Sequence, residues 1–166
     1  GITVDDAGFI LNNEMDDFSI KPGHPNAYGL VGSKANSIHP GKRMLSSMTP
    51  TIVESSDNDI YLVLGSPGGS TIITTVLQII SNVIDFGMDI DQAVESKRFH
   101  HQCLPDKIQL EMFSLPSDVI NKLTSINHDY IYRSKMGIGE ANCIMNYNGL
   151  YYGAADSRRD GKAVGY

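Results

Sequence analysis

The sequence lacks several features that mark particular classes of protein. No apolar run reaches the ~20 residues that a membrane-spanning helix needs, so no transmembrane span is predicted. The chain has no block of basic residues and a net charge of −6, which argues against nucleic acid or an anionic membrane as its main partner. Its composition is instead that of an ordinary soluble globular protein, and we expect residues 1–166 to form a single domain or one piece of a domain.

Cysteine and histidine give no support for a metal site or a redox site. The two cysteines, Cys103 and Cys143, lie far apart and form no C-x-x-C pattern. We expect both to be buried, small apolar side chains. His100 and His101 are adjacent, so they point to different sides of a strand or helix and make a poor metal pair. The sequence therefore gives no support for a zinc site or for dithiol redox chemistry.

The most specialised stretch is a glycine loop between two apolar segments. Residues 60–64 are predicted to form a buried strand and residues 71–84 a buried helix. The loop between them, GSPGGS, lacks the Lys-Ser/Thr pair of a Walker A motif and the spacing of a dinucleotide fingerprint. Its glycines tolerate positive φ, and Ser70 can cap the helix. The free N–H groups at the helix start suit an anion or a developing oxyanion, although a tight turn without a ligand is the alternative.

Two polar clusters near the N-terminus could bind a charged group. Glu14, Asp16 and Asp17 follow two asparagines, a pattern typical either of a solvated acidic turn or of a site for a cation. Ser46 and Ser47 can donate hydrogen bonds to a carboxylate, or they can stabilise a local turn. No G-x-S-x-G motif or neighbouring histidine marks either serine as a nucleophile.

The order of predicted elements indicates an α+β fold. Asp89 and Gln92 form a possible capping box that opens a helix, Pro116 starts an amphipathic helix, and Asn148-Gly149 predicts a hairpin turn. Residues 19–43 have no clear periodicity and are expected to be irregular. Further strands are predicted at residues 9–11, 51–53, 108–110, 130–132, 142–147 and 150–154. Hairpin-type neighbours beside consecutive helices favour a largely antiparallel sheet layered with helices. We expect helices to sandwich the sheet, because segment 60–64 has no polar face.

Several distinctive motifs lie in order along nearly the whole chain. They are NNEMDDF at residues 12–18, KPGHPNAYGLVG at 21–32, KRMLSSMTPTIV at 42–53, GSPGGSTIITTVLQ at 65–78, RFHHQCLPD at 98–106, MGIGEANCI at 136–144 and GAADSRRDGKAVGY at 153–166. Together they resemble the C-terminal part of the small subunit of γ-glutamyltranspeptidase. The resemblance implies a four-layer αββα fold of the N-terminal nucleophile hydrolase type, present here as an incomplete fragment. It also implies a precursor that cuts itself into a large and a small subunit, and a periplasmic or extracellular location.

The resemblance also implies an enzymatic activity and roles for particular residues. In this family an N-terminal Thr attacks a γ-glutamyl amide such as glutathione, and the acyl-enzyme passes its γ-glutamyl group to water or to an acceptor amino acid or peptide, with no cofactor. Glu14 and Asp17 match residues that hold the substrate α-amino group. Ser46 and Ser47 match the pair that contacts the α-carboxylate. Gly68 and Gly69 match the backbone donors of the oxyanion hole.

The chain also departs from the family pattern. The nucleophilic Thr stands before the segment that matches Gly1, and the arginine that binds the α-carboxylate belongs to the large subunit. We therefore expect this chain alone to be inactive. Two alternatives stay open: an acylase of the same fold for cephalosporin-type or poly-γ-glutamate substrates, whose relatives lose the amino-acid contacts, and a noncatalytic anion-binding module that uses only the glycine loop.

Overall fold

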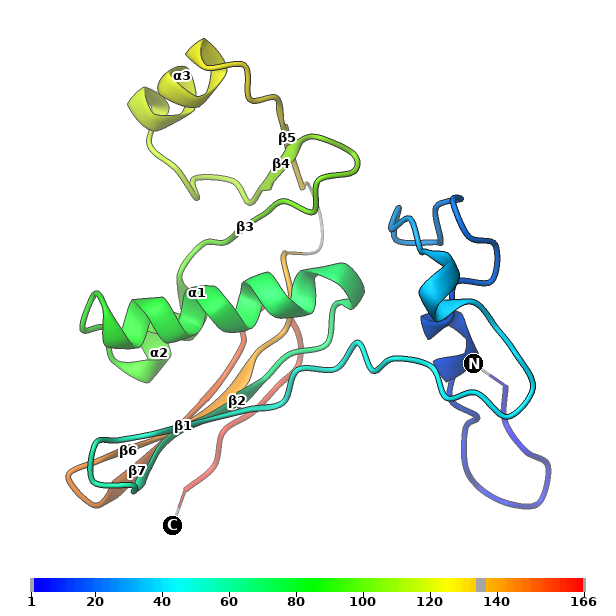
Figure 1. Cartoon of the computed structure of the whole chain (residues 1–166). Helices are drawn as coiled ribbons and strands as arrows, with labels where there is room; N and C mark the ends of the chain where they lie inside the picture. The colour runs from blue at the N-terminus through cyan, green and yellow to red at the C-terminus, as the bar shows by residue number, and fades with distance from the viewer. Residues whose placement is uncertain (1, 134–136, 166) are drawn as a thin grey trace. The chain divides into compact units, whose positions relative to one another are not determined.

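The computed structural model describes residues 2–133 and 137–165, which divide into two compact units, Gly1–Ser47 and Met48–Tyr166 (Figure 1). Met136, the first residue of the MGIGEANCI motif, lies outside the described residues, as do Gly1 and Tyr166.

The first unit is mostly irregular, as expected for residues 19–43. Its helical turns are two short 3₁₀ helices, η1 (Glu14–Asp17) and η2 (Lys34–Asn36). The predicted strand at residues 9–11 is reduced to one antiparallel bridge between Thr3 and Ile10. An isolated pair of extended segments is only marginally stable in water, which accounts for the short pairing.

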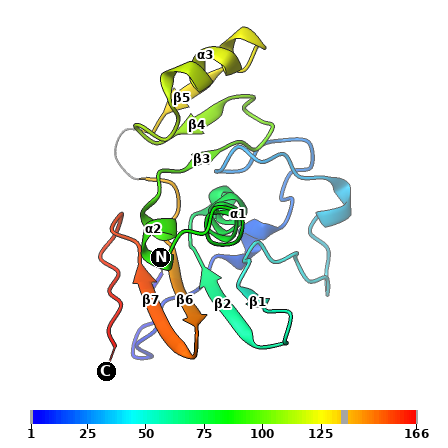
Figure 2. The ribbon, with the colours of Figure 1, turned by 90° about the vertical axis from the view of Figure 1, so that its left-hand side faces the viewer.

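The second unit is built on an antiparallel sheet in the order β1-β2-β6-β7 (Figure 2). The prediction of these strands is confirmed, with bounds Thr51–Glu54, Ile60–Gly65, Asn142–Tyr147 and Leu150–Ala155. Asn148 and Gly149 connect β6 to β7 with φ values of +53° and +78°. Positive φ at both central residues is the signature of a type I′ hairpin turn, so the predicted turn is also confirmed.

Helices α1 (Ile72–Ile84) and α2 (Ile90–Glu95) pack on one face of this sheet (Figures 1 and 2). Val76, Ile79 and Val83 recur at helical spacing and are buried in the core with Leu62 and Leu64 of β2. The α2 start is as predicted, because the Asp89 side chain accepts a hydrogen bond from the Gln92 amide at 2.8 Å.

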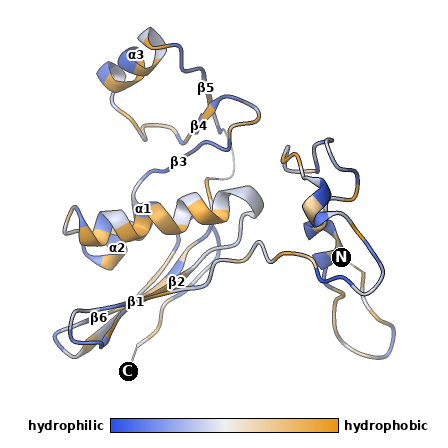
Figure 3. Ribbon diagram, in the orientation of Figure 1, coloured by the Kyte–Doolittle hydropathy of each residue, from blue (hydrophilic) through white to orange (hydrophobic). Residues whose placement is uncertain are grey.

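Helix α1 is apolar on more than one side, which is visible as its long orange stretch in Figure 3. The side away from the sheet carries Ile73 and Leu77, which are 63% and 59% exposed. The prediction of a fully buried helix is therefore only half right within this chain. The opposite face of the sheet is apolar as well, because Ile52, Val63 and Ile144 are paired across three strands and are exposed. The unit thus supplies one helical layer and one sheet layer of the expected four-layer fold.

A small second sheet in the order β3-β4-β5 is attached to this unit. Its strands are Phe99–His100, Ile108–Leu110 and Tyr130–Tyr132, and helix α3 (Ser117–Ser125) lies between β4 and β5 in the chain. In the sequence, Ile108 and Leu110 alternate with three polar residues, Lys107, Gln109 and Glu111, which predicts a half-buried strand. The prediction of a polar, exposed side is wrong, because Gln109 and Glu111 are both buried. Glu111 is buried with an ionic partner, Arg158, and Gln109 accepts a hydrogen bond from Arg133, and the sequence shows neither contact.

Candidate functional site

The acidic cluster of the first unit forms a helical turn with two carboxylates on one side. Asn12 accepts a hydrogen bond from the Glu14 amide at 3.1 Å, which is the local side-chain bond expected of such a turn. Glu14 and Asp17 are three residues apart in the 3₁₀ helix η1, where side chains at this spacing lie above one another. Both are half-buried, whereas Asp16 is exposed. The turn thus presents a pair of negative charges.

The Asp17 carboxylate is joined to one of the two adjacent serines. The Ser47 hydroxyl donates to Asp17 Oδ1 at 2.5 Å, so its acceptor in this structure is a carboxylate of the chain itself. Ser46 precedes it and is exposed. A second contact, which the sequence does not indicate, has Asn36 Nδ2 donating to the Asp17 main-chain oxygen at 2.6 Å. Asn36 in turn accepts a hydrogen bond from the Ser19 amide at 2.9 Å, so Asp17 is held through its side chain and its backbone.

The glycine loop of the second unit joins β2 to α1, as predicted. The backbone angle φ is +142° at Gly68 and +57° at Gly69, a region that favours glycine. The predicted cap by Ser70 is wrong, because Ser70 lies inside a 3₁₀ turn, η3 (Gly69–Thr71), that precedes α1. The Thr71 hydroxyl closes this turn by donating to the Gly68 carbonyl at 2.9 Å.

The amide groups of this loop are available to a ligand. Neither the Gly68 N–H nor the Gly69 N–H has an acceptor among the residues that the structure describes. Both precede the 13-residue helix α1, whose dipole places partial positive charge at this end. Two free donors at a helix start can stabilise an anion or the oxygen of a tetrahedral intermediate.

Close to the loop lies a network of buried charges. Arg98 Nη1 contacts Asp156 Oδ2 at 2.7 Å, and Arg158 forms two hydrogen bonds of 2.7 Å with Glu111. Arg158 Nη1 also contacts Asp156 Oδ1 at 3.0 Å. Arg98 and Asp156 are 1% and 0% exposed, and each carboxylate accepts backbone amides as well. Each buried charge therefore has a counterion and further partners, as burial requires.

These contacts set the ionisation of the two carboxyl groups. Burial raises the pKa of Glu111, but the hydrogen bonds from Arg158 and from backbone amides outweigh it and hold the pKa below its ordinary value of 4.5. Asp156 behaves likewise: burial raises its pKa, while the Ala141 amide and Arg158 bring it below 3.8. Both groups are therefore ionised at neutral pH.

The lowered pKa values predict how stability depends on pH. Because they lie below the ordinary values, the stabilisation is complete above about pH 5 and is lost as the pH falls through the lowered values. In the complete protein, Glu111→Gln is expected to lower the melting temperature at pH 7 and to flatten its decline below about pH 4. Circular dichroism melts from neutral to acidic pH measure this, with the exposed Asp57→Asn as the control. An unchanged acid profile for Glu111→Gln would contradict the assignment.

The cysteines and His100 lie apart from the charged clusters described above. Cys143 is buried, which raises its pKa to about 12, but Cys103 is exposed, so its predicted burial is wrong. His100 is buried between Thr74 and Gln102, each 2.8 Å from a ring nitrogen, and burial lowers its pKa.

Within the described residues, no group of three or more His, Cys, Asp or Glu side chains could hold a metal ion. No helix in the same ranges is long and apolar enough to cross a membrane.

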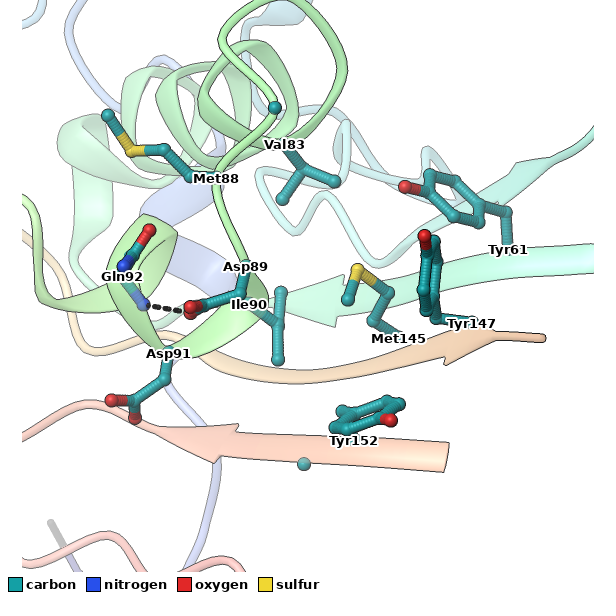
Figure 4. Close-up of a pocket in the computed structure, with 12 residues that line it drawn as sticks. Tyr61, Val83, Met88, Asp89, Ile90, Asp91, Gln92, Met145, Tyr147 and Tyr152 are labelled. Atoms are coloured by element: carbon teal, nitrogen blue, oxygen red, sulfur yellow. Dashed lines mark hydrogen bonds between the residues drawn. The ribbon is translucent and has the colours of Figure 1, made fainter. Parts of the chain in front are cut away.

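A hollow of about 740 Å³ lies at the other end of α1 from the glycine loop. Figure 4 shows the rings of Tyr61, Tyr147 and Tyr152 around Met145, with the Asp89–Gln92 cap at its edge. Since α1 has 13 residues, the two places are separated by about 20 Å along the helix. The hollow therefore contributes nothing to chemistry at the glycine loop.

Comparison with known proteins places this geometry in a family. The whole chain, residues 1–166, matches the family described as gamma-glutamyltranspeptidase. It is 47% identical to the glutathione hydrolase proenzyme of Escherichia coli, over all of this chain and 28% of that protein. It therefore spans under a third of that relative's length.

Solved structures agree. A Helicobacter pylori gamma-glutamyltranspeptidase mutant matches with a TM-score of 0.88 at 52% identity, over 95% of this chain and 86% of the matched chain. A Bacillus halodurans cephalosporin acylase shares only the fold, at 23% identity and a TM-score of 0.68 over 76% of this chain and 24% of the matched one. The expected N-terminal nucleophile hydrolase fold is thus confirmed, and this chain belongs to the γ-glutamyltranspeptidase family.

Proposed function

We propose that this chain is part of a γ-glutamyltransferase and glutathione hydrolase. The complete enzyme cleaves γ-glutamyl amides through an acyl-enzyme and transfers the γ-glutamyl group to water or to an acceptor amino acid or peptide. The family membership supports this proposal. The Asp17–Ser47 hydrogen bond supports it as well, because it joins two motifs, 30 residues apart, to which the resemblance assigns donor recognition.

Each candidate residue has a distinct role in this proposal. Glu14 and Asp17 bind the α-amino group of the donor, because two carboxylates on one side of a turn suit an ammonium group. Ser46 and Ser47 contact its α-carboxylate through their hydroxyl groups, for which the Ser47 hydroxyl exchanges its present acceptor, Asp17 Oδ1, for an oxygen of the donor. Gly68 and Gly69 donate their amides to the oxyanion that forms when the γ-carbonyl is attacked.

The reaction also requires parts of the protein outside residues 1–166. We propose that the nucleophilic Thr and the arginine that binds the α-carboxylate are supplied by other segments, the latter by the large subunit of the same precursor. The isolated chain is therefore inactive in this proposal. The complete protein acts in the periplasm or outside the cell, where extracellular glutathione and other γ-glutamyl compounds are its donors.

A pair of chromogenic donors tests the proposal. The complete enzyme is expected to release the anilide from γ-glutamyl anilide, and an added acceptor amino acid should raise the rate if transfer competes with hydrolysis. Glutaryl anilide, which lacks only the α-amino group, should react at least about tenfold more slowly in kcat/KM because it forms no ion pair with the two carboxylates. Preference for the glutaryl donor would instead indicate an acylase, and no turnover of either would favour a noncatalytic module.

A further inference from the structure

The glycine loop is tied to a distant segment by one side chain, Ser66. Its hydroxyl accepts a hydrogen bond from the Glu140 amide at 2.9 Å and donates to the Pro67 carbonyl at 2.7 Å. Glu140 lies 74 residues further along the chain, just before β6. The hydroxyl thus donates one hydrogen bond and accepts another, and it connects the residue before Gly68 with the backbone at Glu140.

The two backbones are also in direct contact. A Cβ atom added at Gly68 would lie 3.4 Å from the Cα of Gly139. One added at Gly139 would lie 2.4 Å from Thr75 Oγ1 and 2.9 Å from Ser66 Oγ, closer than real Cβ atoms approach other atoms. The glycine loop therefore lies against the segment around Gly139, where there is no room for a side chain at Gly139 itself.

The supporting segment is itself fixed from its other side by the buried charge network. Ile138 donates its amide to Glu111 Oε1 at 2.6 Å, and its carbonyl accepts from Arg98 Nη1 at 2.8 Å. The Ala141 amide donates to Asp156 Oδ2 at 2.9 Å. Hydrogen bonds to charged groups away from water are the stronger kind, so residues 138–141 form a rigid support.

We propose that Ser66 is a positioning residue for the oxyanion donors. By tying the loop to the Glu140 backbone, it holds the Gly68 and Gly69 amides in the orientation that receives the developing negative charge. This inference rests on the proposed function of the two glycines. It assigns Ser66 a role in the chemical step, which is measured by kcat, rather than in donor binding. Donor atoms act on an oxyanion only within a narrow range of distance, so a small displacement of the loop is costly to the reaction.

The test is Ser66→Ala in the complete enzyme. This substitution removes both hydrogen bonds of the hydroxyl and leaves the glycines and the proline of the loop in place. We expect kcat for γ-glutamyl anilide to fall about 10- to 100-fold, because misplacement of a catalytic group by about 1 Å can cost 10²-fold. Affinity for a boronate analogue that forms a tetrahedral adduct should fall in step with kcat, while affinity for a nonreactive glutamate analogue stays the same. Ser66→Thr, which keeps the hydroxyl, should restore most of the rate.

Two further variants separate the possible outcomes. Ser81→Ala, which removes a hydroxyl bonded to Asp85 at the far end of α1, should leave kcat unchanged. A slow Gly69→Val enzyme together with a normal Ser66→Ala enzyme would overturn the role of Ser66 alone, whereas normal rates for both would overturn the oxyanion assignment itself. The Ser66 proposal is equally wrong if Ser66→Thr is as slow as Ser66→Ala, or if both analogues lose affinity to the same extent.

Discussion

Gly69→Val in the complete enzyme is expected to lower kcat about 10²–10³-fold, the loss found when one oxyanion donor is removed. Gly69 has a φ of +57°, which a β-branched side chain adopts only with strain. The substitution therefore shifts the backbone and turns its N–H away from the reacting oxygen. Donor binding depends on other groups and should change little, so the effect appears in kcat rather than in KM.

Steady-state kinetics with γ-glutamyl anilide measures this effect, and binding of a nonreactive glutamate analogue reports donor affinity. Gly149→Val is a matched control, because Gly149 also has positive φ, at +78°, but lies in the β6–β7 turn. This control should lower thermal stability without changing kcat. A folded Gly69→Val enzyme with near-normal kcat would reduce the glycine loop to a simple strand-to-helix connection.

Asp17→Asn is expected to lower kcat/KM for γ-glutamyl donors by about 30- to 5,000-fold, since loss of one partner of a desolvated charge pair costs ~2–5 kcal/mol. Asparagine keeps the shape of the side chain and can still accept the Ser47 hydroxyl through its oxygen. Only the negative charge is removed, so the predicted loss reports the interaction with the donor ammonium group.

Two comparisons make the Asp17 prediction specific. Asp16→Asn alters the neighbouring, exposed carboxylate of η1 and should have little effect on kcat/KM. Glutaryl anilide, which has no ammonium group, should lose far less activity in Asp17→Asn than γ-glutamyl anilide does. If both donors lose activity to the same extent, the assignment of Asp17 to the α-amino group is wrong.

The elements that the sequence predicted well are those set by local pattern. Strand β2, helix α1 and the Asn148-Gly149 turn follow from apolar runs and turn residues that are contiguous in the chain. Local pattern was misleading where a three-dimensional contact decided the outcome. Cys103, for example, has a φ of +67° in an exposed loop after β3, which its apolar character does not reveal.

The candidate site shows the same division. The sequence indicated that Asp17 and Ser47 could each take part in a charged site, but only the family resemblance connected them, because 30 residues separate them. The ionic network was missed because Arg98 and Asp156 are 58 residues apart and Glu111 looked like the polar side of a strand. Neither its partners nor the role of Ser66 follows from periodicity or composition.

The same network has a consequence for how the chain folds. Arg98 and Glu111 find their ion-pair partners only in residues 156–158, which follow the β6–β7 hairpin in the chain. Contacts of such long sequence separation form slowly, because the intervening chain must first be ordered. We therefore expect the support of the glycine loop to be completed late in folding, once the last strand of the sheet has left the ribosome.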